Sequence, residues 1–335
     1  MTALWTVDPL LPDAATLAEP ASWLAAGRLV AFPTETVYGL GANALSSGAI
    51  EALYQAKGRP KANPLIVHVA TLAAARALTS AWPDTAEALA SRFWPGPLTL
   101  VLPHGGKVPP CVTASGETVA LRIPGHAVAL QLILMAGVPV AAPSANLSGQ
   151  ISPTLPEHVW GGLGGRIDGL VAGGPCSRGV ESTVVDLSGP WPRLLRPGPL
   201  DPAELEAALG LAAGGLWRPN LAVATGDGPR RSPGLMGRHY APRAPVICLE
   251  DASAAASLSA ACQQRGEIHA WLALSPGPGT ALLPSDPAGA MRSLYRIMHE
   301  IDKSGPACIL VTLPPAEGRW LALRDRILRA GLPKD

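Results

Sequence analysis

The residues best suited to chemistry are three cations in the segment KGRPKANPLIVH, residues 57–68. Lys57, Arg59 and Lys61 stand within five positions of one another, although the whole chain has only five lysines. Leu65 then begins an apolar run that predicts a buried strand. A basic loop leading into a core strand indicates a site for a phosphate-bearing substrate, and a solvated charged turn is the alternative.

Further polar side chains lie at or inside other apolar runs, where the sheet of an α/β protein gathers its ligands. Thr34 and Thr36 follow the run LVAF and predict either a helix N-cap or part of a site. Arg122 stands inside the run VALRIP, and a buried arginine needs a carboxylate partner. That partner is either a ligand or a protein side chain, Glu35 or Glu181.

Three later segments repeat this placement. Ser144 and Asn146 follow the run PVAAP, Ser182 precedes VVDL, and Arg196 stands beside the turn of LLRPG. Small hydroxyl and amide groups can bind a nucleotide or its phosphates without steric bulk. Each segment alone is only a turn signal, and their recurrence at strand ends indicates a common site.

A loop rich in Gly, Pro and Arg follows, and its motif SPGLMGRHYAP covers residues 232–242. This composition breaks regular structure and predicts a linker over residues 210–244. Tyr240 in the motif indicates either a plain tether or a lid that stacks on a ligand.

The elements that must position these residues alternate between strands and helices over the first 209 residues. This alternation predicts an α/β catalytic domain over residues 1–209, with the strand order left open. The predicted strands are residues 29–32, 65–69, 98–102, 119–123, 138–141 and 183–187, and the predicted helices are residues 49–56, 84–92 and 127–136.

A second, smaller α/β domain is predicted over residues 245–335, near the lower limit of domain size. Its predicted strands are residues 246–249, 270–274 and 307–311, and its predicted helices are residues 252–265 and 288–301.

Composition bounds the function class. The chain has 335 residues, 48% of them hydrophobic, and a mean hydropathy of +0.23, which excludes disorder of the whole chain. A net charge of +1 argues against a global attraction to nucleic acid or membrane. Five scattered cysteines without a CxxC pair argue against a disulfide framework or structural zinc. With no secretory signal or membrane span predicted, a reducing cytoplasm fits best.

Seven motifs resemble, in their order, those of the YrdC-type L-threonylcarbamoyladenylate synthases. They are AFPTETVYGLGA, KGRPKANPLIVHV, WPGPLTLVLP, TVALRIPGH, APSANLSG, GVESTVVDL and LLRPGPL. The linker motif and the C-terminal α/β domain resemble the longer members of this family, with residues 316–331 matching loosely. The resemblance implies a YrdC-like twisted open sheet with flanking helices, plus a smaller Rossmann-like C-terminal domain.

The resemblance also implies a reaction. L-threonine, bicarbonate and ATP, with Mg²⁺ on the phosphates, give threonylcarbamoyl-AMP and pyrophosphate. A tRNA-modifying threonylcarbamoyl transferase complex accepts the product. An RNA-binding YrdC module without synthase activity is the alternative, although the near-neutral charge predicts weak RNA contact at most. The hydrogenase-maturation carbamoyltransferases share this module, but they carry CxxC pairs and an acylphosphatase region that the chain lacks.

Site residues follow from the same resemblance. The positions that match threonine contacts are Thr36, His68, Arg122, Ala142 and Ser182. The positions that match ATP contacts are Lys57, Arg59, Asn63, Thr118, Ser144, Asn146, Ser152, Arg196 and Tyr240. Lys57 and Arg59 are expected to be catalytic, because they would stabilise charge as pyrophosphate leaves. His68 is expected to contact the ligand rather than act as a base, and no side chain is expected to ligate a metal.

Overall fold

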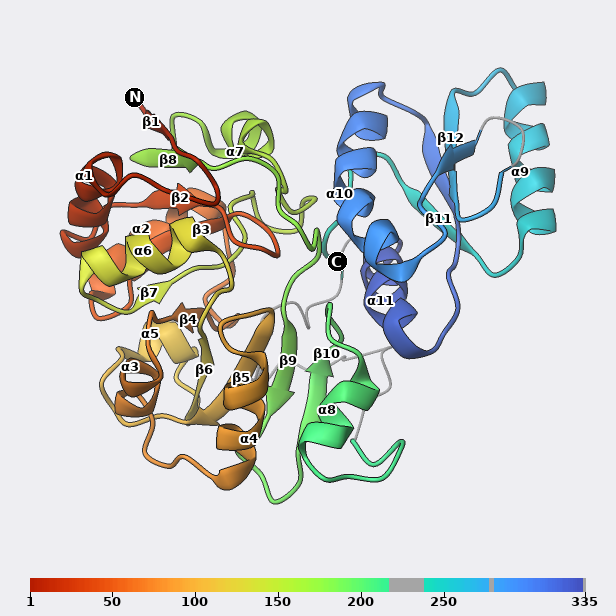
Figure 1. The fold of residues 1–335 in the computed structure, drawn as a ribbon. Helices are drawn as coiled ribbons and strands as arrows, with labels where there is room; N and C mark the ends of the chain where they lie inside the picture. Colours follow the sequence, from red (N-terminus) through yellow and green to blue (C-terminus); the bar gives the residue numbers. More distant parts are fainter. Residues whose placement is uncertain (217–237, 277–279, 334–335) are drawn as a thin grey trace.

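The computed structural model describes residues 1–216, 238–276 and 280–333. The part of the linker motif before Arg238 lies outside the described residues. Residues 1–209 are called the N-terminal unit and residues 245–333 the C-terminal unit, and Figure 1 shows them as two lobes, red to green and blue.

A ten-stranded mixed sheet forms the N-terminal unit. Its strands are β1 (Ala3–Thr6), β2 (Val30–Phe32), β3 (Gly39–Asn43), β4 (Ile66–His68), β5 (Leu98–Pro103), β6 (Thr118–Arg122), β7 (Val140–Ala141), β8 (Gly169–Ala172), β9 (Thr183–Asp186) and β10 (Arg193–Arg196). Their order is β1-β8-β2-β3-β7-β4-β6-β5-β9-β10. All six predicted strands of this unit overlap observed ones, whereas β1, β3, β8 and β10 were not predicted.

Helices cover both faces of this sheet. They are α1 (Ala14–Ala25), α2 (Ser47–Lys57), α3 (Leu72–Ala77), α4 (Asp84–Phe93), α5 (Pro110–Thr113), α6 (Ala127–Ala136), α7 (Pro156–Leu163) and α8 (Pro202–Ala208). Successive side chains of a strand point to opposite faces of a sheet, and strand β2 packs against helices on both faces in this way. Val30 and Phe32 join the cluster that holds α1 and α6, while Ala31 between them joins the cluster that holds α2.

The ends of helix α2 explain how the basic loop is placed. The side chain of Ser46 caps the first turn by accepting a hydrogen bond from the amide of Ala49. Gly58 ends the helix in the left-handed region, with φ of 58°, where glycine is favoured. The chain therefore turns sharply between Lys57 and Arg59, so that the two side chains lie in different surroundings.

A four-stranded parallel sheet forms the C-terminal unit, in the order β11-β14-β12-β13. The strands are β11 (Val246–Leu249), β12 (His269–Ala273), β13 (Thr280–Leu282) and β14 (Cys308–Thr312), and the helices are α9 (Ala252–Gln264), α10 (Pro287–Lys303), α11 (Leu321–Ala330) and a 3₁₀ turn (Gly318–Trp320). In Figure 1, α9 lies on the far side of this sheet, and α10 and α11 face the N-terminal unit. The α/β prediction is confirmed for both units.

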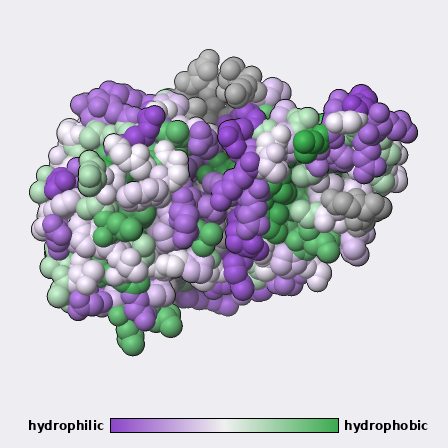
Figure 2. All heavy atoms as spheres, turned by 90° about the horizontal axis from the view of Figure 1, so that it is seen from above, coloured by the Kyte–Doolittle hydropathy of each residue, from purple (hydrophilic) through white to green (hydrophobic). Residues whose placement is uncertain are grey.

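One hydrophobic cluster joins the two units. It contains Val37 and Val180 of the N-terminal unit, Tyr240 of the linker, and Leu294 and Ile327 of the C-terminal unit, among others. Figure 2 shows hydrophilic side chains along the junction of the lobes on the face seen there, so the cluster is shielded on this side.

The backbones of the two units approach closely at Gly179. A Cβ atom added to Gly179 would lie 2.4 Å from the Cα of Arg292 on α10. Any side chain at this position would therefore push the units apart.

Neither a disulfide bond nor a candidate membrane-spanning helix is found within the described residues. All five cysteines are free, as expected of a chain without a disulfide framework. None of the helices within the described residues combines the length and apolar character that a membrane crossing requires.

Candidate active site

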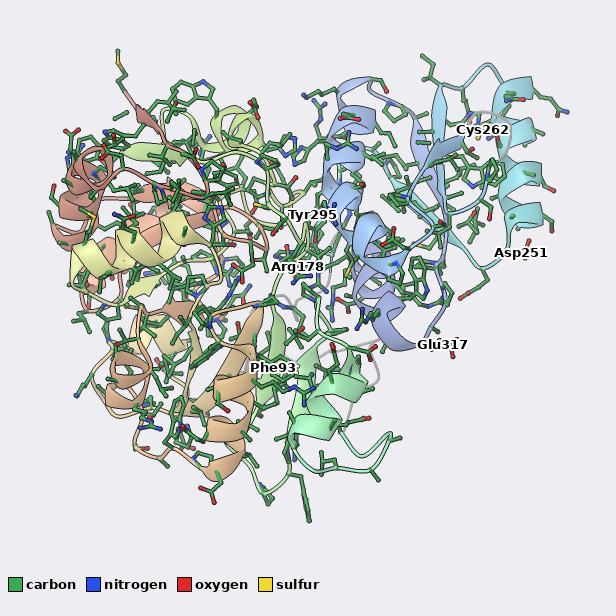
Figure 3. The ribbon with its side chains drawn as sticks, viewed as in Figure 1. Phe93, Arg178, Asp251, Cys262, Tyr295 and Glu317 are labelled. Carbon is green, nitrogen blue, oxygen red and sulfur yellow. The ribbon has the colours of Figure 1, made fainter. Side chains whose placement is uncertain are left out.

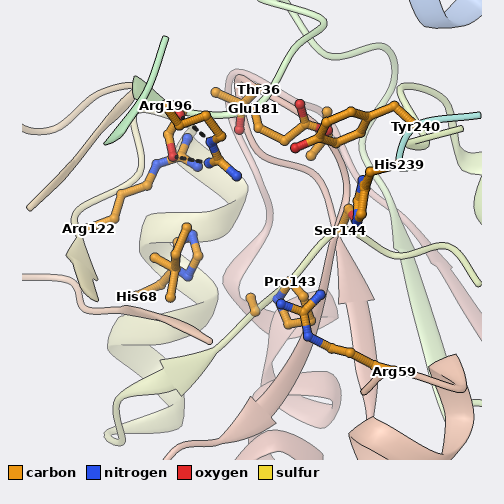
Figure 4. A pocket seen from close by; sticks show the side chains of 14 residues that line it. Thr36, Arg59, His68, Arg122, Pro143, Ser144, Glu181, Arg196, His239 and Tyr240 are labelled. Atoms are coloured by element: carbon orange, nitrogen blue, oxygen red, sulfur yellow. Dashed lines mark hydrogen bonds between the residues drawn. The ribbon is translucent and has the colours of Figure 1, made fainter. Parts of the chain in front are cut away.

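A polar cleft lies where β4, β6 and the segment before β9 come together. His68 and Arg122 are the last residues of two parallel strands, and they pair directly in register. Ala142 lies beside them, since its amide donates to the carbonyl of Ile66 at 3.0 Å. Figure 4 shows the polar side chains converging on one space. The lining residues are Thr36, Val37, Arg59, Ile66, His68, Arg122, Ala142, Pro143, Ser144, Glu181, Ser182, Arg196, His239 and Tyr240.

The threonine pair after β2 forms a turn rather than a helix cap. The hydroxyl of Thr34 lies 2.8 Å from that of Thr36 and donates to the carbonyl of Val37 at 2.6 Å. No helix begins here, because the chain turns directly into the antiparallel strand β3. The N-cap alternative is therefore wrong, and Thr36 is left facing the cleft.

Arg122 has a carboxylate partner within the protein. Its Nη2 lies 2.7 Å from Oε1 of Glu35, and its Nε donates to the carbonyl of Gly96 at 3.2 Å. Both side chains of the ion pair are buried. Of the two carboxylates considered from sequence, Glu35 is the partner of Arg122, and the guanidinium still lines the cleft.

His68 is a buried neutral imidazole. Burial, and next the charge of Arg122, lower its pKa to about 3. Its Nδ1 makes no hydrogen bond to a described residue, although the side chain is only 2% exposed. A polar atom without a partner in such a place is ready to bind a ligand.

Ser182 and Arg196 are fixed to each other. Arg196 donates from Nε to the carbonyl of Ser182 at 3.0 Å and from Nη2 to its hydroxyl at 3.1 Å. The same hydroxyl lies 2.7 Å from that of Thr99 on β5. Burial lowers the pKa of Arg196, and its guanidinium remains a cation beside the serine.

The two expected catalytic cations have different surroundings. Arg59 lines the cleft, donates to the carbonyl of Pro64 at 3.0 Å, and has its pKa lowered by burial to about 10, so it is charged at neutral pH. Lys57 does not line the cleft. Its Nζ donates to the carbonyls of Ser144 and Asn146, and burial, with the nearby charge of Arg59, lowers its pKa well below the usual value. Lys57 therefore supports the loop that forms one wall.

The structure brings nine predicted site residues to the cleft, namely Thr36, Arg59, His68, Arg122, Ala142, Ser144, Ser182, Arg196 and Tyr240. The other five, Lys57, Asn63, Thr118, Asn146 and Ser152, do not line it. Thr118 lines a neighbouring cavity with Leu65 and Arg193. Asn146 donates to the carbonyls of the loop that follows it, and Ser152 donates to Glu181 at 2.5 Å.

Five lining residues were not assigned to the site from the sequence, and the two polar ones are Glu181, which was considered only as a partner of Arg122, and His239. Glu181 directly precedes the predicted Ser182, and His239 directly precedes the predicted Tyr240. Adjacency to a predicted site residue was the available signal in both cases. Burial lowers the pKa of His239 to about 3, so this second imidazole is also neutral.

Tyr240 brings the described end of the linker into the site. Its side chain is 1% exposed, and its φ of 61° lies in the left-handed region, which is rare for a bulky residue. The ring packs edge-on against His239, with centroids 4.1 Å apart, and 6.0 Å from the ring of Tyr295. Opening and closing of this segment as a lid stays a prediction, because residues 217–237 lie outside the described part.

The charge of the cleft suits an anionic ligand. Arg59, Arg122 and Arg196 line it, whereas Glu181 is the only carboxylate among the lining residues within the described part of the chain. Across the described part of the chain, no group of three or more His, Cys, Asp or Glu side chains could hold a metal ion. The arrangement can orient and neutralise anions, and this is the main requirement of phosphoryl or nucleotidyl transfer.

Comparisons with known proteins place the whole chain among characterised relatives. A family model described as "Telomere recombination" matches residues 22–198, and one described as "Threonylcarbamoyl-AMP synthase, C-terminal domain" matches residues 201–331. The threonylcarbamoyl-AMP synthase of Bacillus subtilis is 40% identical over 98% of this chain and 97% of that protein. The synthase of Pyrococcus abyssi is 40% identical over 92% of each. The crystal structure of P. abyssi Sua5 complexed with L-threonine is 37% identical, with a TM-score of 0.93 over 98% of each chain.

Proposed function

The chain belongs to the threonylcarbamoyl-AMP synthase family, and from this premise we propose how its cleft performs the reaction. The enzyme makes L-threonylcarbamoyl-AMP from L-threonine, bicarbonate and ATP, and releases pyrophosphate. Its product serves the threonylcarbamoyladenosine modification of tRNA. The alternative of an RNA-binding module without synthase activity is thereby set aside.

We propose that L-threonine binds at the end of the cleft formed by β4 and β6. Arg122 would bind the carboxylate, while Glu35 and the carbonyl of Gly96 hold the guanidinium in place. Ser182 and the neutral His68 would contact the polar groups of the substrate. The P. abyssi relative crystallised with L-threonine supports threonine as the ligand.

ATP, as its magnesium complex, would occupy the other end of the cleft. Arg59 and Arg196 would neutralise the phosphates, and Tyr240 would contact the nucleotide. Glu181 is already engaged with the hydroxyls of Ser152 and Tyr295. Mg²⁺ would therefore be held by phosphate oxygens and water, which is the usual way it accompanies a nucleotide.

The chemistry then needs position and charge rather than a nucleophilic side chain. The free threonine amine attacks bicarbonate, with loss of water, or the CO₂ formed by its dehydration, with loss of a proton to solvent. The resulting carbamate oxygen then attacks the α-phosphorus of ATP. The bond from this phosphorus to the bridging oxygen breaks, and pyrophosphate leaves with the bonding electrons. Arg59 would stabilise the charge that builds up on the leaving group.

The cationic cleft, with three lining arginines, is the observation that carries this assignment. The test is to incubate purified protein with ATP and measure pyrophosphate and threonylcarbamoyl-AMP. Release is expected only when threonine and bicarbonate are both present. Production of ADP, or pyrophosphate release independent of threonine, would contradict the proposed reaction.

The product acceptor and the compartment stay predictions. The threonylcarbamoyl adenylate is a mixed anhydride, so we propose that a tRNA-modifying transferase complex receives it in the cytoplasm. Direct tRNA binding is expected to be weak, given the net charge of +1. A salt titration of filter binding measures it.

A further inference from the structure

We propose that Arg326 of the C-terminal unit is a positioning residue for the synthase reaction, because it holds Glu181 and the end of β10 in the wall of the cleft. The C-terminal unit would thereby complete the active site rather than serve as an appendage. This inference rests on the proposed function.

Arg326 reaches across the junction from α11. Its side chain has no solvent exposure, and its Nε lies 2.6 Å from Oε2 of Glu181, a residue 145 positions earlier in the chain. Its Nη2 donates to the carbonyl of Pro197 at 3.1 Å, and its Nη1 lies 2.6 Å from Asp325. One guanidinium therefore joins the start of β9 to the end of β10. A planar fork with five donors suits this task, and a lysine could not replace it.

Helix α10 supplies a second hold on the same carboxylate. The hydroxyl of Tyr295 donates to Oε2 of Glu181 at 3.0 Å, and Ser152 donates to Oε1 at 2.5 Å. Figure 3 labels Tyr295 at the junction of the lobes. Close packing of α10 on Gly179 leaves this part of the chain little room to move. Glu181 is therefore fixed from both units.

These contacts act on residues that face the substrates. Glu181 is adjacent to Ser182, and Pro197 is adjacent to Arg196, which itself donates twice to Ser182. Movement of the Glu181 carboxylate would therefore displace a residue at the threonine end and another at the ATP end. Misplacement of a reacting group by about 1 Å costs about 100-fold in rate.

The charges around Glu181 support a permanent carboxylate. Burial raises its pKa, but Arg326, Arg196 and the hydrogen bond from Ser152 together lower it by more. The pKa therefore lies below the usual value of a glutamate. The titratable and charged groups that interact with it are Arg196 on β10, His239 and Tyr240 in the linker, Tyr295 on α10 and Arg326 on α11, and Asp325 pairs with Arg326. Without Arg326, the largest of these lowering effects is lost, so the pKa of Glu181 would rise.

The main experiment compares Arg326→Met with Arg324→Met in the full-length chain. Arg324 lies on the same helix and also forms an ion pair, with Glu250 at 2.6 Å, but this pair stays within the C-terminal unit. We expect Arg326→Met to lower kcat/KM for threonine and ATP by about 10- to 100-fold, and Arg324→Met to change it less than twofold. Equal losses in the two variants would overturn the proposal.

A pH profile separates positioning from general damage to the fold. In Arg326→Met, loss of the cation raises the pKa of Glu181, so on acidification kcat/KM should begin to fall at a higher pH than in the wild type. This upward shift should be absent from the double variant Glu181→Gln/Arg326→Met. Parallel profiles for wild type and Arg326→Met would overturn the proposal.

Tyr295→Phe provides the test if Arg326→Met does not fold. It removes one hydroxyl that donates to Glu181 and leaves the ring in the shared core. We expect a loss of about two- to tenfold in kcat/KM, with little change in the melting temperature. Unchanged kinetics in Tyr295→Phe, with no folded Arg326 variant, would count against the proposal. Wild-type pyrophosphate release measured alongside tests the function separately.

Discussion

The two ends of the cleft are built differently. At the proposed threonine end, His68 and Arg122 end two paired strands of one sheet, and Glu35, in the turn between β2 and β3, holds the arginine. At the ATP end, Arg59 stands in a loop, and Tyr240 comes from the linker and packs against the C-terminal unit. The comparison teaches that the sheet itself builds one end of the cleft, whereas the proposed ATP end needs parts of the chain brought together over long distances.

The largest expected effect tests the threonine end. Arg122→Met should lower kcat/KM for threonine by about 100- to 1000-fold, because truncating one partner of a buried charge pair costs about 2 to 5 kcal/mol. Steady-state pyrophosphate release measures the loss.

A second variant separates binding from stability. Arg122→Met leaves Glu35 buried without its cation, and urea unfolding should show a loss of about 3 to 5 kcal/mol. The double variant Glu35→Gln/Arg122→Met should recover much of the stability but none of the activity. Recovery of activity in the double variant would mean that Arg122 serves only Glu35.

The next effect tests the two cations beside the ATP end. Arg59→Gln should lower kcat by about 100-fold, because a cation that stabilises the leaving group acts mainly in the transition state. Lys57→Met should lower kcat less, by about tenfold, and should also lower the melting temperature, because Lys57 holds the loop carbonyls of Ser144 and Asn146. A loss at Lys57 as large as that at Arg59, with an unchanged melt, would instead assign Lys57 to the phosphates.

A smaller effect concerns the methyl group of threonine. Ile66 and Ala142 line the cleft near His68 and offer apolar surface to the proposed threonine site. Serine should therefore be a poorer substrate by about 10- to 200-fold in kcat/KM, which is the usual worth of one buried methyl group. Competition between serine and threonine in one reaction measures the ratio directly. A ratio near one would show that neither residue contacts the methyl group.

The smallest effect compares the imidazoles at the two ends. Burial lowers the pKa of His68 and of His239 to about 3, below the unfolded value of about 6.5. Between these values the unfolded chain binds protons that the folded chain refuses. The free energy of unfolding should thus fall as the pH drops below about 6.5, by up to about 1.4 kcal/mol per pH unit for each histidine, and level off below about 3.

Urea unfolding at pH 7 and pH 5 checks this expectation. His68→Asn and His239→Asn should each make the free energy of unfolding less dependent on pH, and the double variant should do so most. A pH dependence unchanged in one single variant would show that folding does not lower the pKa of that histidine.

All five residues predicted to contact threonine line the cleft, whereas only four of the nine predicted to contact ATP do, and the reason is physical. His68, Arg122 and Ser182 lie at or beside short apolar runs, and a local pattern is enough to find such strand ends. Lys57 could not be placed, because its position depends on how helix α2 ends and on carbonyls nearly 90 residues away. The strand order could not be predicted either, because strands pair with partners far away in the sequence. For example, β8 lies between β1 and β2.

Arg326 is the extreme case of this limit. It sits in the stretch of sequence that resembled the family least clearly, and its partner Glu181 is 145 residues away. Nothing in the residues next to Arg326 distinguishes it from Arg324 or Arg329, two other arginines of the same helix. Only the packing of α11 on the N-terminal unit makes it different.

The contact at Gly179 has a consequence for how the two units can be recombined between homologous proteins. The backbone of α10 touches this glycine so closely that a methyl group would not fit. A chimera that takes its C-terminal unit from a relative must therefore match the surface around Gly179 as well as supply an arginine at position 326. The two units are expected to be inherited as a pair, because a mismatch at their junction would displace residues that line the cleft.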